Sequence, residues 1–272
     1  MLSAKKRDRL HKVELSTLPL GPTTARVWTA GAGEAIVLLH GPWAGAEAYW
    51  FKVADELGRH YRVIAPELPG IGAPGDLLPS FGAYAGWLDA LLDAMAVERC
   101  VLVGNALGAS IAWRYAAQHP ARCRALVMVN GFPPPDYPRV VRWMARHWPA
   151  RGAIRDNFRR NVYGSTVLGQ AFHDRANAPK AIVQALDHFS PAEVDAALDL
   201  LLAEDAPVPP PSQRTLLIFG EADRMPPFDK KGARTMREKL ADSRMVTIAA
   251  AGQMPQVEHP VAFLRALRDF VR

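Results

Sequence analysis

The chain has 272 residues, of which 49% are hydrophobic and 22% charged, with a formal net charge of +6. This composition is typical of a globular protein with one large core, and no apolar run is long enough to span a membrane. The two cysteines have no histidine or cysteine neighbours at zinc-binding spacing, and residues 1–9 lack the apolar core of a signal peptide. We therefore expect a cytoplasmic protein with reduced cysteines that uses no metal and no cofactor.

The positive charge is concentrated between residues 139 and 160, where seven arginines accompany one carboxylate, that of Asp156. Such a stretch can be a solvated helix face, or it can attract an anionic ligand or an acidic carrier protein. Aromatic residues do not alternate with the basic ones as single-stranded nucleic acids require, so we expect no nucleic-acid partner.

The predicted elements alternate between strands and helices along most of the chain. An edge hairpin over 11–18 and 24–29 is followed by apolar strands at 35–39 and 62–66, a helix over 81–96, a strand from residue 100, a helix over 107–118 and a strand over 125–130. Strands at 215–220 and 244–249 and a helix over 257–271 complete the chain. This alternation predicts an α/β protein with a mostly parallel, twisted sheet and right-handed crossovers.

The middle of the chain departs from this pattern. Proline clusters at 133–135 and 209–211 bracket a region with helical periodicity and no convincing strand. We therefore predict two parts, a core formed by residues 1–131 and 212–272 and a helical cap formed by residues 132–211.

One stretch carries most of the functional information. The strand from Cys100 runs into Gly-Asn-Ala-Leu-Gly at 104–108, and a helix pattern follows. A strand–turn–helix of this kind is the context of a nucleophile elbow, which reads Gly-x-Ser-x-Gly in its active form. Here the central residue is Ala106, whose methyl group cannot attack a carbonyl.

Five segments in one order resemble the α/β-hydrolase superfamily, and the resemblance covers nearly the whole chain. They are the His-Gly pair at 40–41, Leu-Pro-Gly-x-Gly at 68–72, the elbow at 104–108, Gly-x-x-Asp at 220–223 and Gly-x-Met-Pro-Gln at 252–256. The resemblance implies the α/β-hydrolase fold with a helical cap over the sheet.

The resemblance also implies roles for particular positions, in the chain order nucleophile, acid, histidine. Ala106 matches the nucleophile, Asp223 the acid and Gln253 the histidine, so the triad is degenerate on this reading. Glutamine has no titratable nitrogen, although its amide can hydrogen-bond to Asp223. Of the two oxyanion-hole donors that the resemblance implies, Leu107 can supply one, whereas the other falls on Pro42, which has no N–H. A shift of the loop would let Trp43 donate in its place.

These features leave three functions open. The first is a non-hydrolytic enzyme of lyase, cyclase or isomerase type that positions its substrate, with Asp223, Gln253, Asn105 or water moving protons. The second is a non-catalytic pseudohydrolase that binds an apolar small molecule or a partner protein. The third is an inactivated variant of a serine hydrolase acting on esters or thioesters.

We expect the ligand to occupy a largely apolar pocket between the cap and the sheet. The candidate binding residues are Pro42, Trp43, Ala106, Leu107 and Trp143. The ligand is expected to be apolar or amphipathic, and the basic cap suits one with an anionic end or one delivered by a carrier protein.

Overall fold

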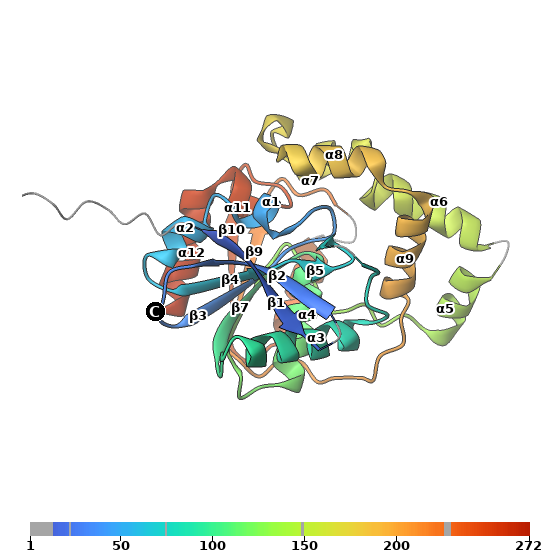
Figure 1. Ribbon diagram of the computed structural model, residues 1–272. Helices are drawn as coiled ribbons and strands as arrows, with labels where there is room; N and C mark the ends of the chain where they lie inside the picture. The colour runs from blue at the N-terminus through green and yellow to red at the C-terminus, as the bar shows by residue number, and fades with distance from the viewer. Residues whose placement is uncertain (1–12, 22, 74, 148–149, 226–229) are drawn as a thin grey trace, which may run out of the picture.

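A mostly parallel sheet forms the centre of the molecule in the computed structural model, which describes residues 13–21, 23–73, 75–147, 150–225 and 230–272. Its order is β1-β2-β4-β3-β7-β8-β9-β10, where only the β1–β2 and β2–β4 pairs are antiparallel (Figure 1). The strands are β1 (Glu14–Leu20), β2 (Thr23–Ala30), β3 (Ala35–Leu39), β4 (Arg62–Pro66), β7 (Cys100–Asn105), β8 (Cys123–Val129), β9 (Thr215–Gly220) and β10 (Ser243–Ile248). Two short strands, β5 (Leu68–Pro69) and β6 (Gly72–Ala73), pair separately.

Helices cover both faces of the sheet, because its central strands carry apolar side chains on both sides. In β3, Ile36 and Leu38 belong to one buried cluster, whereas Val37 and Leu39 belong to the other. The first cluster includes residues of α1 (Ala46–Trp50), α2 (Ala54–Gly58), α11 (Pro255–Glu258) and α12 (Pro260–Val271). The second includes residues of α3 (Phe81–Ala94), α4 (Leu107–Gln118) and α10 (Lys230–Glu238).

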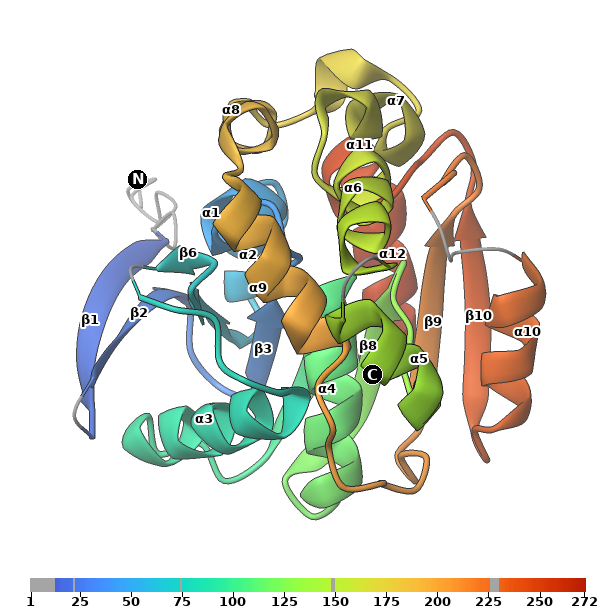
Figure 2. The same ribbon diagram turned by 90° about the vertical axis from the view of Figure 1, so that its right-hand side faces the viewer.

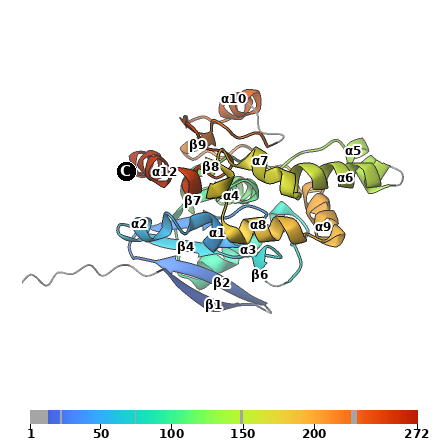
Figure 3. The same ribbon diagram turned by 90° about the horizontal axis from the view of Figure 1, so that it is seen from above.

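The described residues between β8 and β9 form five α-helices, which sit beside the carboxyl ends of the parallel strands (Figures 1 and 2). They are α5 (Arg139–Arg146), α6 (Ala150–Val162), α7 (Leu168–Ala171), α8 (Lys180–His188) and α9 (Pro191–Leu201), with short 3-10 turns at Ser165–Val167 and Arg175–Asn177. The view from above shows α5, α6, α8 and α9 extending to one side of the sheet (Figure 3). We keep 132–211 as the proposed extent of this cap.

Hydrogen bonds tie the cap to the core next to the elbow. The Trp43 indole N–H donates to the Val162 carbonyl at 2.8 Å, and the Gln253 backbone N–H donates to the Ala171 carbonyl at 2.6 Å. The carboxylate of Glu258 accepts the backbone N–H groups of His173 at 2.9 Å and of Gly252 at 2.6 Å. Glu258 therefore joins a cap residue to the loop that carries Gln253.

The sequence located most core elements correctly. The predicted mostly parallel sheet is confirmed, and the ranges 35–39, 62–66, 107–118 and 215–220 are reproduced. The predicted helix over 257–271 is divided instead, because Pro260 has no N–H to donate and disfavours helical geometry at the preceding residue. Only β1 is an edge strand of the N-terminal hairpin, since β2 pairs with β4. The prediction missed α1, α2 and α10.

The structure also bears on the chemistry of the two cysteines and on membrane insertion. Cys100 and Cys123 are free and buried. Within the described ranges, no helix combines the length and the apolar character needed to cross a membrane.

Candidate functional site

The predicted elbow is a sharp corner between β7 and α4. Ala106 has φ 49° and ψ −112°, a conformation that a residue with a Cβ atom adopts only under strain. A Cβ atom on Gly104 would collide with the backbone of Gly108, and one on Gly108 would collide with the Leu39 carbonyl. The two glycines therefore let the helix approach the strands closely enough to hold Ala106 at this corner.

Ala106 borders a cavity of about 1050 Å³ between the cap and the sheet. This volume is at the upper end of the range of roughly 300–1,000 Å³ that small-molecule sites occupy. Most of the lining is apolar, and it comes from the core loops as well as from the cap helices. The core contributes Ile71, Leu77, Leu107 and Met225, and the cap contributes Val141, Ile154, Phe158, Phe189, Leu198 and Leu201.

Five of the predicted site residues meet at this cavity, namely Pro42, Trp43, Ala106, Leu107 and Gln253. They come from the loop after β3, the corner between β7 and α4 and the loop before α11, which the parallel strands bring to one edge of the sheet.

Three other predicted site residues lie elsewhere. Asn105 and Asp223 are absent from the cavity lining, and Asn105 is completely buried beneath it. The Asn105 side-chain amide donates to the carbonyls of Val129 and Gln253, at 3.0 and 2.9 Å. Trp143 is 60% exposed and stacks on His147 at 4.7 Å between ring centroids. Arg142 and Ala145 occupy the inner side of α5 instead, so Trp143 faces away from the expected ligand.

The buried side chain of Gln253 points its amide at a backbone carbonyl. Its Nε2 donates to the Asn130 carbonyl at 3.1 Å, and this contact fixes which end of the amide is the oxygen. The Gln253 oxygen has no hydrogen-bond partner among the residues that the structure describes. The hydrogen bond that the sequence suggested between Gln253 and Asp223 is absent from the contacts of the described residues. Instead, Gln253 donates to the backbone carbonyl of Asn130, and the Asn130 side chain donates to Asp223.

Asn130 links Asp223 to the rest of the site and was not predicted from the sequence. Its Nδ2 donates to Asp223 at 2.5 Å, and its Oδ1 accepts the Gly220 backbone N–H at 3.0 Å. Asn130 has φ 42°, which asparagine tolerates better than most residues. The Asn130-Gly131 pair at the end of the predicted strand 125–130 was the sequence feature that could have identified this residue.

Burial is the main reason why the pKa of Asp223 is raised to about 7, and the hydrogen bonds from Met225 and Asn130 counteract it. The Met225 backbone N–H donates to the second carboxylate oxygen at 3.0 Å. Asp223 can therefore change its charge near neutral pH, although neither Asp223 nor Asn130 is among the residues that line the cavity.

Few backbone N–H donors are available in the loop after β3, where the resemblance places part of an oxyanion hole. Pro42 has no N–H, and the next donor, the Trp43 backbone N–H, points to the Tyr49 hydroxyl at 3.3 Å. The Leu107 N–H lies in the first turn of α4, where backbone donors have no partner within the helix. One of the two donors that acyl transfer needs is thus in place.

His40 precedes this loop and serves the turn. Its Nε2 accepts the Leu68 backbone N–H at 2.9 Å, so the proton is on Nδ1, which donates to the Gly41 carbonyl at 2.8 Å. Burial lowers the pKa of His40 to about 4, which keeps the ring neutral. This histidine is a structural residue of the loop.

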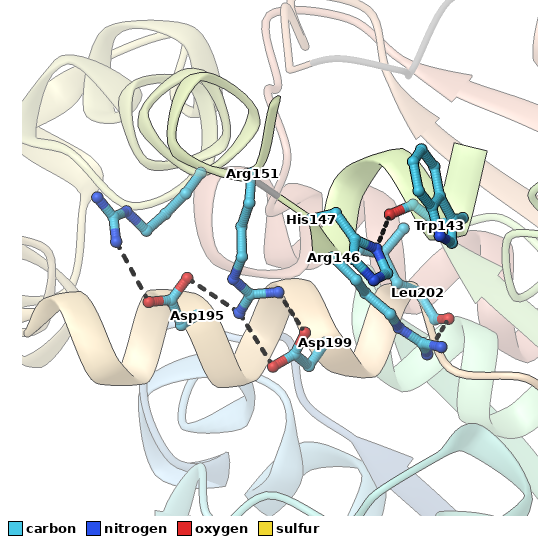
Figure 4. A network of polar contacts seen from close by, with 8 residues as sticks. Trp143, Arg146, His147, Arg151, Asp195, Asp199 and Leu202 are labelled. Atoms are coloured by element: carbon cyan, nitrogen blue, oxygen red, sulfur yellow. Dashed lines mark hydrogen bonds and ion pairs between the residues drawn. The ribbon is translucent and has the colours of Figure 1, made fainter. Parts of the chain in front are cut away.

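Four of the seven arginines between residues 139 and 160 contact a polar partner within the cap, and Figure 4 shows the contacts of Arg146 and Arg151. Arg151 lies 3.3 Å from Asp195 and 3.0 Å from Asp199, both on α9. Arg146 donates to the Leu202 carbonyl at 3.0 Å, and the buried Arg142 pairs with Asp136 at 3.1 Å. The two α9 carboxylates therefore offset the charges of Arg151 and Arg155, whereas Arg139, Arg159 and Arg160 are exposed.

No group of three or more histidines, cysteines or carboxylates suited to a metal ion occurs within the described part of the chain.

Comparisons with known proteins place these features in a family. The model of the Alpha/beta hydrolase family matches residues 36–266. A 2-hydroxy-6-oxo-2,4-heptadienoate hydrolase of Pseudomonas putida is 26% identical over 253 residues, which cover 89% of this chain and 90% of that protein. A pimeloyl-[acyl-carrier protein] methyl ester esterase of Aeromonas hydrophila is 27% identical over 260 residues, which cover 89% of this chain and 96% of that protein.

A solved structure shows the same architecture. The 2-hydroxy-6-oxo-6-phenylhexa-2,4-dienoate hydrolase from Rhodococcus sp. strain RHA1 superposes with a TM-score of 0.69 at 19% identity, covering 95% of this chain and 98% of that one. This likeness confirms the predicted α/β-hydrolase fold. With its strand order, its strained corner after β7 and a family match over most of its length, the chain belongs to the Alpha/beta hydrolase family.

Proposed function

We propose that this family member binds an apolar small molecule in the cavity beneath the cap and does not hydrolyse it by a serine mechanism. The observation that carries the proposal is Ala106, which occupies the strained corner at the wall of a cavity of about 1050 Å³. The fold keeps the corner and the cavity, whereas the side chain at the corner cannot form a covalent intermediate.

Two further substitutions support the absence of acyl transfer. Gln253 stands where the resemblance places the general base, and a carboxamide cannot take up a proton near neutral pH. Pro42 withholds an oxyanion donor, a loss worth roughly 3–4 kcal/mol of transition-state stabilisation. A single Ser→Ala replacement in an active hydrolase would explain neither Gln253 nor Pro42.

The lining indicates the class of ligand. Among the residues of the described ranges that line the cavity there is no lysine or arginine, whereas Asp76 and Glu193 are present. An anionic end would therefore lack a cationic partner inside the cavity. The polar side chains of the lining are concentrated on the cap, where Asn157, Asn161 and His188 border the cavity. We infer a neutral ligand with an apolar body near the elbow and a polar end toward the cap.

A non-hydrolytic reaction has one observation in its favour, the pKa of Asp223 near 7, which suits a proton-transfer group. Binding without conversion is favoured because Asp223 does not border the cavity, and because Asn105 is engaged by two backbone carbonyls. The same experiment distinguishes the two functions.

The test starts from a neutral apolar probe, Nile red, whose fluorescence rises on transfer to an apolar site. The Ala185→Phe variant introduces a ring into the cavity, because Ala185 of α8 lines it. Ala181→Phe is the matched control, since Ala181 lies one turn earlier on the same helix and is exposed. We expect Ala185→Phe to weaken probe binding at least tenfold and Ala181→Phe to leave it unchanged.

Compounds that co-purify with the protein are then identified by mass spectrometry before and after incubation with fresh protein. A compound recovered unchanged and displaced by Nile red supports binding. A compound converted by the protein would establish catalysis in place of binding, and equal probe affinities in both variants would remove the cavity as the binding site.

A further inference from the structure

The outer surface of the cap carries an unusual concentration of apolar side chains. Nine large hydrophobic residues of the described chain are exposed, and five of them lie between residues 137 and 144. They are Tyr137, Val140, Val141, Trp143 and Met144, and together they form what we call the α5 apolar face. Val140 is 61% exposed and Trp143 60%, so this face is uncovered in the monomer. Apolar surface gathered in this way marks an interaction site.

The burial of α5 is the reverse of that of an ordinary surface helix. Its inner side holds Ala145 and the charged Arg142, which is 8% exposed and paired with Asp136. Its outer side holds Val140, Trp143 and Met144. A helix that buries an arginine while it exposes a tryptophan is arranged for a partner on its outer side.

The charge and the shape of this face fit a lipid surface. Two exposed arginines, Arg139 and Arg146, stand at the ends of α5, and the helix carries no acidic residue. Arginine beside tryptophan and aliphatic residues is the pattern of helices that lie in the interface of anionic membranes. Figure 1 places α5 at the outer edge of the cap, far from the sheet, and Figure 2 shows it in front of the sheet. A flat bilayer can therefore reach it.

The α5 apolar face also continues into the cavity. Tyr137 and Val141 are exposed on the surface, and both also line the cavity. An apolar molecule dissolved in a bilayer would thus meet a continuous apolar path between the lipid and the cavity. A purely protein-binding surface gives no reason for this continuity.

We propose that α5 docks the protein on the surface of anionic phospholipid membranes, with Trp143 and Met144 entering the interface and Arg139 and Arg146 contacting lipid phosphates. The docking is peripheral and does not depend on what the cavity binds.

The test is co-sedimentation of the full chain with vesicles of phosphatidylcholine alone or with about a third phosphatidylglycerol. We expect binding to the anionic vesicles that weakens as salt is raised. Replacing both Trp143 and Met144 with serine should weaken it at least tenfold, and Arg139→Gln about fivefold. Val261→Ser and Arg244→Gln are the matched controls, since Val261 is 72% exposed on α12 and Arg244 is exposed on β10, and they should bind as the unaltered chain does.

A second measurement places the contact at the helix. Anionic vesicles should shift the tryptophan emission to shorter wavelength, and Trp143→Phe should remove that shift. The cavity variant Ala185→Phe should keep full vesicle binding, so that a failure of the proposed ligand function does not affect this result.

Three outcomes would overturn the proposal. The first is equal sedimentation with neutral and anionic vesicles, or with neither. The second is a dimer in solution that the Trp143 and Met144 replacements dissociate, which would assign the α5 apolar face to a second copy of the chain. The third is binding to a purified acidic carrier protein without binding to vesicles, which would make the partner a protein.

Discussion

Restoring hydrolysis stepwise would test whether the corner at Ala106 is a nucleophile elbow that has lost its chemistry. Ala106→Ser alone should stay nearly inert on p-nitrophenyl butyrate, because its hydroxyl has no base to activate it. Adding Gln253→His supplies that base, which typically contributes about 100- to 10,000-fold. The new imidazole would replace the amide that now donates to the Asn130 carbonyl at 3.1 Å.

The gain in kcat expected from a third substitution follows from the backbone donors of the loop after β3. The Trp43 N–H is engaged with the Tyr49 hydroxyl at 3.3 Å, and Pro42 has no N–H, so the double variant keeps only the donor at Leu107. Pro42→Ala in the same background adds a backbone donor. One such donor is worth about 100- to 1,000-fold in kcat.

The assay is the release of p-nitrophenol by the single, double and triple variants, each compared with the unaltered protein. The control is Pro135→Ala in the double variant, since Pro135 also lines the cavity but lies in the segment before α5. Equal kcat values for the double and triple variants would refute our view of the oxyanion loop. Robust turnover by Ala106→Ser alone would show that a base already exists and would favour the inactivated-hydrolase interpretation.

Two further predictions concern stability. Glu258→Ala should lower the free energy of unfolding in urea by about 3 kcal/mol, because the Gly252 N–H is left buried without an acceptor and the cap loses a tie to the core. The exposed Glu238→Ala should change it by less than about 0.5 kcal/mol, and an equally small effect of Glu258→Ala would rule out this role. For Asp223, the folded-state pKa of about 7 lies above the unfolded value of roughly 3.9, so the native state holds its proton more tightly. Stability should therefore decline as pH rises from about 4 to 7 and then level off. Asp223→Asn should flatten this decline in unfolding experiments across that range, and an unchanged slope would show that another group causes it.

Much of the core could be predicted because it depends on local sequence. Apolar runs such as 35–39 and 215–220 form strands that are covered on both faces. The two glycines around Ala106 indicate a tight turn in which the helix approaches the strand closely. Asn130 was missed because its role depends on Asp223, which lies 93 residues away in the chain. Periodicity carries no information about such a pair.

The sequence by itself indicated most of the core strands and helices in their chain order and the tight corner at Ala106, because both follow from residue type and near-neighbour spacing. Only the tertiary structure decided which arginines of the cap are paired with carboxylates and which side of α5 is exposed. Arg151 is paired with Asp199, which is 48 residues away, so a local count of arginines overstated the free positive charge. Trp143 faces outward because Arg142 and Ala145 take the inner positions of α5, and that choice depends on the partners that the rest of the fold places beside the helix.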